Sequence, residues 1–258
     1  SQLGMTVAVV ERAELGGICL NWGCIPTKSL LKSAQVLEYA HHAADYGVKI
    51  ENAAPDFDAI IARSRGVADK MSKGIQYLFK KNNITVIEGH GKLTADKTVE
   101  VTNAAGEKTI FEAQHIVLAT GARSRQLPNI PQDGKRIIGY RQALTLDHKP
   151  ESMIVGGSGA IGSELAYFYN AMGTKVLLVE FMPTILPLED EEVSKQVGRS
   201  FKKAGIDVMV KSSVESVESG EGLLKVNIKN KKGEITRLKS CCLPWVLPRT
   251  WKTSVWKN

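Results

Sequence analysis

The segment from Met153 to Phe181, MIVGGSGAIGSELAYFYNAMGTKVLLVEF, constrains the fold more than any other part of the chain. A short apolar run leads into a glycine turn, a stretch with helical spacing follows, and a second apolar run ends on an acidic residue. This order predicts a strand, a tight turn, a helix and a second, parallel strand. Such a unit is the building block of a Rossmann-like sheet, so the expected fold class is α/β.

The glycine spacing Gly157-x-Gly159-x-x-Gly162 at this turn indicates a dinucleotide site. Glycines let backbone N–H groups approach a pyrophosphate at a helix N-terminus, where the helix dipole favours anions. Glu180, at the end of the second strand, is placed to accept both ribose hydroxyl groups and would repel a 2′-phosphate. The pattern therefore predicts NAD rather than NADP, with a structural strand–helix–strand unit that binds no ligand as the alternative.

The first residues of the chain repeat the end of this unit. Gly4–Glu11 (GMTVAVVE) aligns with Gly173–Glu180 (GTKVLLVE), and in both a glycine precedes the acid by seven positions. Glu11 is therefore interpreted as the ribose acid of a first dinucleotide domain, although it could merely end a strand. By analogy, the matching glycine loop would lie 16 positions before Gly4. We expect the first domain to lack its opening strand and glycine loop in this chain.

Two of the four cysteines, Cys19 and Cys24, lie five positions apart in GGICLNWGCIPTKSLL, just ahead of a helix expected from Pro26 to about Ala40. A thiol at a helix N-terminus has a lowered pKa, and two thiols this close can close and reopen a disulfide. Three interpretations remain open: a redox-active disulfide beside a flavin, two inert buried thiols, or part of a metal site. The first is favoured because a flavin carries electrons between a nicotinamide and a disulfide.

The remaining pattern predicts the order of the other elements. Before the second nucleotide unit we expect a helix at Phe57–Lys81, a strand at Ile84–Glu88, a hairpin meander at Lys92–Phe111 with a turn at Asn103–Gly106, and a buried strand at His115–Ala119. After it we expect a helix at Asp190–Ala204 and strands near Ile206–Val210, Val214–Glu218 and Leu223–Lys229. The predicted domains are 1–149, 150–239 and an atypical tail at 240–258.

Composition sets limits on partners and compartment. The formal net charge is +7, but Arg249, Lys252 and Lys257 supply three of these charges in a tail without acids, and the other lysines are mixed with acids. A nucleic-acid partner is therefore not expected. No apolar run reaches the ~18 residues of a membrane span, and no export signal precedes the first strand. We expect a cytoplasmic protein without a membrane partner, in which a disulfide would be catalytic.

The cysteine segment carries a resemblance to a known family. Cys19-Leu-Asn-Trp-Gly-Cys24-Ile-Pro-Thr-Lys28 closely resembles the active-site segment of the flavin disulfide reductases, and among them most closely the dihydrolipoamide dehydrogenases. The resemblance covers roughly Ser1–Lys239 and includes EGHGKLTADKTV, VLATGARSRQLPNIPQDGKRI and VGGSGAIGSELA. Trp22 stands where valine is common, and Thr27 is a mild variant of serine.

The resemblance implies two nested Rossmann-like domains, with FAD in the first and NAD in the second. It also implies electron transfer from dihydrolipoamide through a Cys19–Cys24 disulfide and FAD to NAD. The implied partners are the lipoyl domain of a 2-oxoacid dehydrogenase complex and a second copy in a homodimer. Another flavin disulfide reductase, a mercuric reductase, or a degenerate fragment that binds at most a nucleotide remain alternatives, and we expect the chain as given to be inactive.

Family roles are carried over only onto matching positions. Cys19 would exchange with the dithiol substrate and Cys24 would lie against the flavin, while Lys28 would lie near flavin N5, paired with Glu164. The implied FAD contacts are Glu11, Gly91, Thr120 and Gly121, and the implied NAD contacts are Gly157, Gly159, Gly162 and Glu180. The family's general base is a histidine of a C-terminal domain. None of the five histidines here lies in that context, so no base is assigned.

The tail SCCLPWVLPRTWKTSVWKN departs from the rest of the chain. It holds three of the four tryptophans and two of the four cysteines in nineteen residues. A reading frame shifted by one base is compatible with VGITPNLENIGLE, which resembles the family's segment after the strands of the NAD domain. We therefore expect a frameshifted tail, with an authentic unusual sequence as the alternative.

Overall fold

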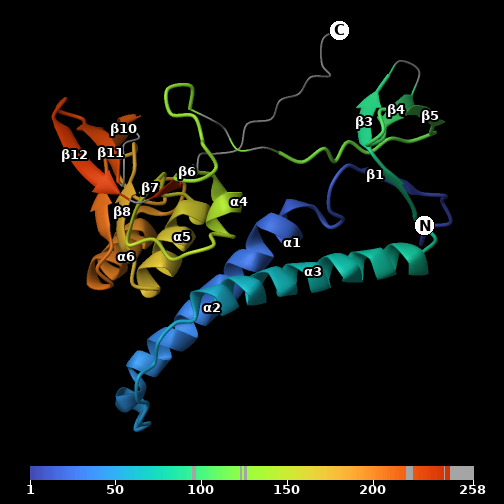
Figure 1. Ribbon diagram of the computed structural model, residues 1–258. Helices are drawn as coiled ribbons and strands as arrows, with labels where there is room; N and C mark the ends of the chain where they lie inside the picture. Colours follow the sequence, from blue (N-terminus) through green and yellow to red (C-terminus); the bar gives the residue numbers. More distant parts are fainter. Residues whose placement is uncertain (95–96, 123, 125–126, 219–222, 241, 245–258) are drawn as a thin grey trace. The chain divides into compact units, whose positions relative to one another are not determined.

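The computed structural model describes residues 1–94, 97–122, 124, 127–218, 223–240 and 242–244 (Figure 1). Their contacts form two compact units. The first unit contains Ser1–Ile25 and Arg65–Ala122, and the second contains Pro26–Ser64 and the described part of Arg123–Thr250. The domain limits expected at 149 and 239 stay a prediction.

The long helices form where the apolar spacing predicted them. α2 spans Cys24–His41 and α3 spans Phe57–Lys81, while a short 3-10 turn, η1, spans Ala43–Tyr46. In α3, Asp58 lies in the first turn and Lys80 and Lys81 lie in the last turn. These charges complement the helix dipole, which supports the helix at both ends. Among the described residues, no helix is both long and apolar enough to cross a membrane.

The first unit holds two small sheets. β1 (Ala8–Glu11) pairs in parallel with β2 (Thr85–Glu88), so that Glu11 lies opposite Glu88. β3 (His90–Leu93), β4 (Thr98–Thr102) and β5 (Lys108–Glu112) form the predicted antiparallel meander. The turn between β4 and β5 is closed by Gly106 N–H donating to the Asn103 carbonyl at 3.0 Å, with Gly106 at φ 83°. A left-handed φ of this kind is the conformation that glycine supplies most readily.

The buried strand expected at His115–Ala119 is wrong. These residues have no regular structure, and the side chains of Val117 and Leu118 are 87% and 53% exposed. A parallel strand needs a neighbour to satisfy its N–H and carbonyl groups. In the described part of the first unit, β1 pairs only with β2, so this apolar run has no strand beside it.

The second unit contains the predicted strand–helix–strand segment almost residue for residue. β7 (Ser152–Gly156) is followed by α5 (Ala160–Ala171) and β8 (Lys175–Val179), and α6 (Glu191–Lys203) leads into β9 (Asp207–Met209). The three strands are parallel in the order β7-β8-β9. This arrangement confirms the α/β class.

Burial of one face of this sheet against α5 supplies most of the core of the second unit. Met153 and Leu178 from the strands pack with Leu165, Phe168 and Tyr169 from the helix, and all five are essentially inaccessible to solvent. Full burial of each large apolar side chain is worth roughly 1.5–3 kcal/mol. The sheet and helix are therefore held rigidly, which fixes the glycine turn between them.

A second antiparallel sheet covers the other side of β7 and β8. It consists of β10 (Ser212–Glu218), β11 (Leu224–Asn230) and β12 (Ile235–Ser240), of which β12 was not predicted. Its apolar residues, Leu224, Val226 and Ile228 among them, pack with Ile154 and Val179. Successive side chains of a strand point to opposite faces, so these residues, which are two positions apart, share the buried face.

The first residues of the expected tail join this unit. Cys242 is buried, and its carbonyl accepts the Ile154 N–H at 3.0 Å. The two-residue strand β13 (Leu243–Pro244) then pairs in parallel with β6 (Ile137–Ile138), which precedes the short helix α4 (Tyr140–Ala143). The rest of the tail, residues 245–258, lies outside the described residues, and so does its expected frameshift.

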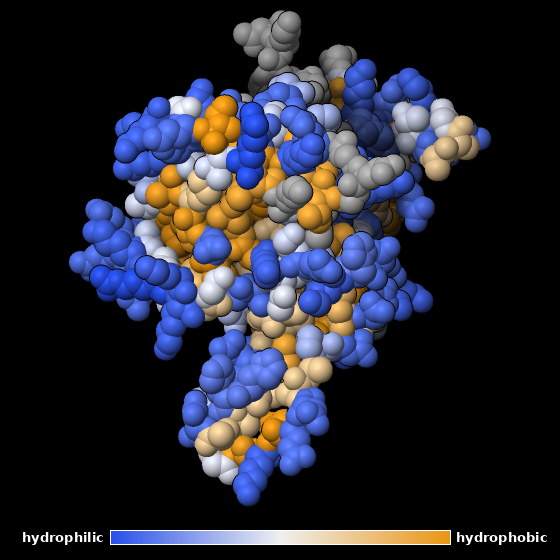
Figure 2. All heavy atoms as spheres, turned by 60° about the vertical axis from the view of Figure 1, so that its left-hand side comes forward, coloured by the Kyte–Doolittle hydropathy of each residue, from blue (hydrophilic) through white to orange (hydrophobic). Residues whose placement is uncertain are grey.

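Apolar surface remains exposed. Hydrophobic residues gather in the middle of the face shown in Figure 2, framed by hydrophilic ones. Exposed large apolar side chains also occur in the loop after β8, at Phe181, Met182 and Leu188. Exposed apolar area of this kind is typical of surfaces that are covered by other protein.

Candidate functional site

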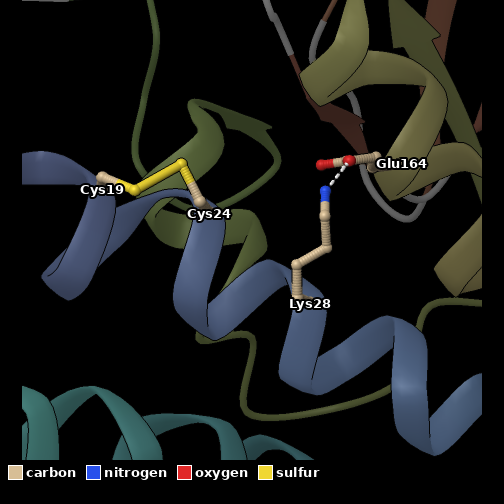
Figure 3. A network of polar contacts seen from close by, with 4 residues as sticks. All are labelled: Cys19, Cys24, Lys28 and Glu164. Carbon is tan, nitrogen blue, oxygen red and sulfur yellow. Dashed lines mark hydrogen bonds and ion pairs between the residues drawn. A yellow bond between two sulfur atoms is a disulfide. The ribbon is translucent and has the colours of Figure 1, made fainter.

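Cys19 and Cys24 form a disulfide in the first unit. Their Cα atoms are 4.8 Å apart, well inside the span that a disulfide can bridge. Cys24 is the first residue of α2, as expected, but Cys19 lies in a short helix, α1 (Gly17–Trp22), rather than in a glycine turn. Figure 3 shows the bridge between the two helices. Cys19 is half-buried and Cys24 is exposed, so the pair is accessible from solvent.

Gly23 makes the close approach of the two cysteines possible. A Cβ atom at this position would lie 2.9 Å from the Ile18 carbonyl oxygen and 3.2 Å from the Cα atom of Cys19. The chain therefore turns from α1 into α2 through a space that admits only glycine. Positive φ angles at Gly16 (97°) and Gly17 (69°) set the other end of α1.

Polar contacts from α3 hold α1 in place, and sequence reasoning missed them. Arg65 Nη1 donates to the Asn21 carbonyl at 2.7 Å, and its guanidinium lies 4.1 Å from the centre of the Trp22 ring. Ser72 Oγ donates to the Leu15 carbonyl at 3.0 Å. A guanidinium stacked on an indole is the best of the cation–π geometries, so the unusual tryptophan adds a fixed contact beside Cys24. Only the apolar spacing of α3 was visible in the sequence.

Lys28 and Glu164 lie together in the second unit. Lys28 extends from α2, one turn beyond Cys24, and points toward Glu164 of α5 (Figure 3). Lys28 Nζ donates to Glu164 Oε1 in an ion pair. Both side chains are partly exposed, so the pair contributes little to stability and mainly fixes where the ammonium group lies. An open depression beside it is lined by Lys28, Leu31, Lys32, Gln35 and Tyr167.

The glycine loop Gly157–Gly162 has the shape of an anion cradle. Gly157 adopts φ 94°, and a Cβ atom on Gly162 would lie 1.9 Å from the Gly157 carbonyl oxygen. Gly159 is the N-cap of α5, has no side-chain cap, and has open space where a Cβ atom would lie. The first helical N–H groups have no partner inside the helix. The loop therefore presents free donors and open space to an anion, as a dinucleotide pyrophosphate requires.

Glu180 is buried at the end of β8, with 7% of its surface exposed. Its Oε2 atom accepts the N–H of Ser158 at 2.8 Å and the Ser158 hydroxyl at 2.7 Å. Its Oε1 atom accepts the Met182 N–H at 2.8 Å. A carboxylate has about four acceptor positions, so one remains at Oε1. The residues present fit NAD, because Oε1 has a position for one ribose hydroxyl. Room for both hydroxyls, which the sequence predicted, would require Glu180 to give up one of its present hydrogen bonds.

The residues expected to contact FAD lie in the first unit. Glu11 ends β1, and its Oε1 atom accepts the N–H groups of Arg12 and Ala13, both at 2.9 Å. Gly91 lies in β3, where a Cβ atom would make a tight contact of 3.2 Å with Val10 Cγ1. Thr120 and Gly121 are exposed, outside regular structure. These roles stay a prediction.

Metal ligation receives no support from the part of the chain that the structure describes. No three His, Cys, Asp or Glu side chains gather there as metal ligands would. His41 and His42 make hydrogen bonds to the carbonyl groups of Ala53 and Glu38, all within the second unit.

The fold and the disulfide define a class of protein. Residues 1–243 match the pyridine nucleotide-disulphide oxidoreductase family, and the chain belongs to that family. The family name joins a pyridine nucleotide with a disulphide, and the chain has a glycine loop in a strand–helix–strand unit and a Cys19–Cys24 disulfide. The α/β fold expected from the glycine pattern is thereby confirmed.

Comparisons with individual proteins give more detail than the family match. The chain is 43% identical over 254 residues to a dihydrolipoyl dehydrogenase of Rhizobium etli, covering 92% of this chain and 53% of that protein. It is 46% identical over 237 residues to a dihydrolipoyl dehydrogenase of Zymomonas mobilis, covering 92% and 51%. The crystal structure of LpdA from Mycobacterium tuberculosis superposes with a TM-score of 0.86 at 27% identity, covering 97% of this chain and 54% of that one. The chain spans about half the length of the relatives it matches.

Proposed function

We propose that this chain carries the redox disulfide and the NAD-binding unit of a dihydrolipoyl dehydrogenase. The observation that carries the proposal is the Cys19–Cys24 disulfide at the N-terminus of α2. Identities of 43% and 46% to two dihydrolipoyl dehydrogenases support this substrate over those of other disulfide reductases. The reaction oxidises dihydrolipoamide to lipoamide and reduces NAD.

The first step is a thiol–disulfide exchange. A thiolate of dihydrolipoamide attacks Sγ of the half-buried Cys19, the Cys19–Cys24 bond breaks, and Cys24 leaves as a thiolate. The second substrate thiolate then attacks the substrate sulfur of the mixed disulfide and releases Cys19. Two electrons pass to the cysteine pair, and the substrate becomes a cyclic disulfide. The positive end of the α2 dipole stabilises the thiolate on Cys24, which makes it a better leaving group.

FAD, when bound, supplies the two-electron carrier between the cysteine pair and the nicotinamide. In this chain Glu11 would bind the FAD ribose through Oε2, the oxygen that its local N–H bonds leave open, with Gly91, Thr120 and Gly121 as further contacts. Lys28, held by Glu164, places a fixed positive charge beside α2.

The NAD contacts are proposed from the second unit. The N–H groups at the start of α5 would bind the pyrophosphate across Gly157, Gly159 and Gly162, and Glu180 would accept a ribose hydroxyl. We also propose that the whole protein acts as a homodimer on the lipoyl domain of a 2-oxoacid dehydrogenase complex in the cytoplasm, where a reducing environment keeps structural disulfides rare.

The proposal can be tested by measuring the thiol–disulfide exchange step on its own. The oxidised chain is mixed with dihydrolipoamide or with dithiothreitol at equal dithiol concentration, and free thiols are labelled and located by mass spectrometry. Cys19 and Cys24 should become labelled much faster with dihydrolipoamide than with dithiothreitol, while the buried Cys242 serves as an internal control. In Cys24→Ser the remaining Cys19 thiolate should attack oxidised lipoamide, whose ring S–S bond breaks, and a mixed disulfide should form on Cys19. Equal rates with both dithiols, or trapping on Cys24 in a Cys19→Ser variant alone, would contradict the assigned roles.

A further inference from the structure

Ser158 is the most densely bonded residue of the glycine loop. Its side chain is fully buried. Its N–H and its hydroxyl both donate to Glu180 Oε2, at 2.8 and 2.7 Å. Its hydroxyl and its carbonyl both accept the Leu186 N–H, at 3.2 and 3.1 Å, and the carbonyl also accepts the Ser163 hydroxyl at 3.0 Å. The sequence pattern treats this position as the variable residue between two glycines, yet the structure gives it three partners.

The direction of the Ser158 hydroxyl proton is fixed by its two neighbours. The Leu186 N–H can only donate, so the Ser158 oxygen must act as acceptor on that side. Glu180 lies on the other side and receives the proton. Leu186 has a φ of 48°, a backbone conformation that leucine rarely adopts, and its N–H donates to Ser158. The loop after β8 and the glycine loop therefore hold the hydroxyl in one orientation.

The consequence is a carboxylate that cannot turn. Glu180 Oε2 already has two donors, both from Ser158, so it has no acceptor position left for a ligand. Oε1 has one donor, the Met182 N–H, and keeps one position. Only this single oxygen is presented to a nucleotide, and its charge stays in place whether or not a ligand is bound.

We propose that Ser158 is a positioning residue that sets the preference for NAD over NADP by locking the carboxylate of Glu180. The inference rests on the proposed function, in which the Gly157–Gly162 loop binds a nicotinamide dinucleotide. A ribose hydroxyl can donate to the free position of Oε1, whereas a 2′-phosphate is an anion that meets a fixed negative charge. A carboxylate that has lost the Ser158 hydroxyl is held by backbone N–H groups alone and can turn away from the phosphate, so the discrimination falls even though Glu180 is still present.

The test compares two buried serines, Ser158 of the glycine loop and Ser163 of the first turns of α5. Ser158→Ala removes the hydroxyl bond to Glu180 and keeps the backbone bond, while the matched control Ser163→Ala removes a hydroxyl that donates only to the Ser158 carbonyl. The full 258-residue chain and both variants are titrated with NADH and with NADPH by calorimetry, and melting curves are recorded for each. Ser158→Thr, which restores a hydroxyl, serves as the conservative variant.

Hydrogen bonds to a charged group are worth about 1.5–3 kcal/mol, which corresponds to roughly 10- to 150-fold in affinity. We expect Ser158→Ala to lower the ratio of the NADPH to the NADH dissociation constant at least about tenfold, and Ser163→Ala to change it less than about twofold. Ser158→Thr should keep the ratio closer to that of the wild type.

Other outcomes distinguish the role of Ser158 from the presence of an NAD site. If Ser158→Ala weakens both nucleotides equally, or changes the ratio no more than Ser163→Ala does, Ser158 has a structural role only and the inference is overturned while the proposed function stands. If the unsubstituted chain binds neither nucleotide, the inference and the proposed NAD site fall together.

Discussion

Replacing Gly162 with alanine should destabilise the glycine loop itself, whether or not a nucleotide is bound. The new Cβ atom would lie 1.9 Å from the Gly157 carbonyl oxygen, where ordinary contact begins at 3.4 Å. The turn would have to open by the difference, about 1.5 Å, between a strand and a helix that are both buried. Overpacking typically costs about 1–3 kcal/mol, and the upper end applies because the atom met is backbone. At about 3 kcal/mol the melting temperature should fall by roughly 6–12 °C.

Gly159→Ala provides the matched control, because a Cβ atom at Gly159 meets nothing within 4 Å and its φ of −63° suits alanine. Loss of a preferred N-cap residue costs roughly 0.5–1 kcal/mol, and the smaller freedom of alanine in the unfolded chain offsets about as much. The melting temperature should change by less than about 2 °C. The methyl group nevertheless enters the open space at the start of α5, so NADH affinity should fall at least about tenfold.

The assay has two independent parts. Thermal unfolding without nucleotide is followed by circular dichroism, and NADH binding is then titrated below the melting range of each variant. The reasoning is refuted if Gly162→Ala melts at the same temperature as the wild type, because the turn would then accommodate a Cβ atom without cost. It is refuted equally if Gly159→Ala binds NADH with unchanged affinity, because the open space would then not be the path of the pyrophosphate.

Two further predictions concern other parts of the chain. Slight burial raises the pKa of Asp133, but the N–H groups of the three residues at 135–137 and the Arg136 charge outweigh it and hold the pKa below its usual value. The charge therefore stabilises the fold above the ordinary carboxyl pKa, by less than about 1 kcal/mol because solvent screens it, and this gain is lost as pH falls through the lowered pKa. Melting temperatures of Asp133→Asn and wild type should differ at pH 7 and converge as the pH falls below the lowered pKa. Arg65→Met should speed amide hydrogen exchange across residues 14–22, since it removes the bond to Asn21 and the contact with the Trp22 ring, worth about 2–4 kcal/mol together. Arg63→Met should not, because the Arg63 guanidinium bonds to Ser29 instead. Equal exchange in the two variants would show that Arg65 does not hold α1.

Elements with a strong local pattern were predictable from the sequence. The helix expected at Phe57–Lys81 has those limits in the structure, because 25 residues of regular apolar spacing leave few alternatives. The unit from β7 to β8 was equally clear, since its glycines, helix and acid each follow from local requirements. The spacing of Cys19 and Cys24 already favoured a disulfide, whereas the Lys28–Glu164 pair was expected only through family resemblance. The structure brings both pairs together.

Features that depend on distant residues were not predictable in this way. The expected strand at His115–Ala119 failed because a parallel strand forms only beside a neighbour, which no local pattern records. Arg65 bonds to a carbonyl 44 positions away, and Ser158 bonds to a carboxylate 22 positions away. Neither residue has an unusual sequence context. Their contacts arise from how helices and strands pack, so only coordinates reveal them.

The contrast between two glycines of one loop also bears on how such a chain would diverge. Gly162 is required by the fold itself, because any side chain would meet the Gly157 carbonyl even without a ligand. Gly159 faces open space, so folding alone places no such demand on it. In gene copies released from selection for nucleotide binding, but still selected for a folded product, position 159 should vary freely while position 162 stays glycine. Variation at these two positions therefore distinguishes selection for the fold from selection for nucleotide binding. The distinction can be tested in any set of related sequences.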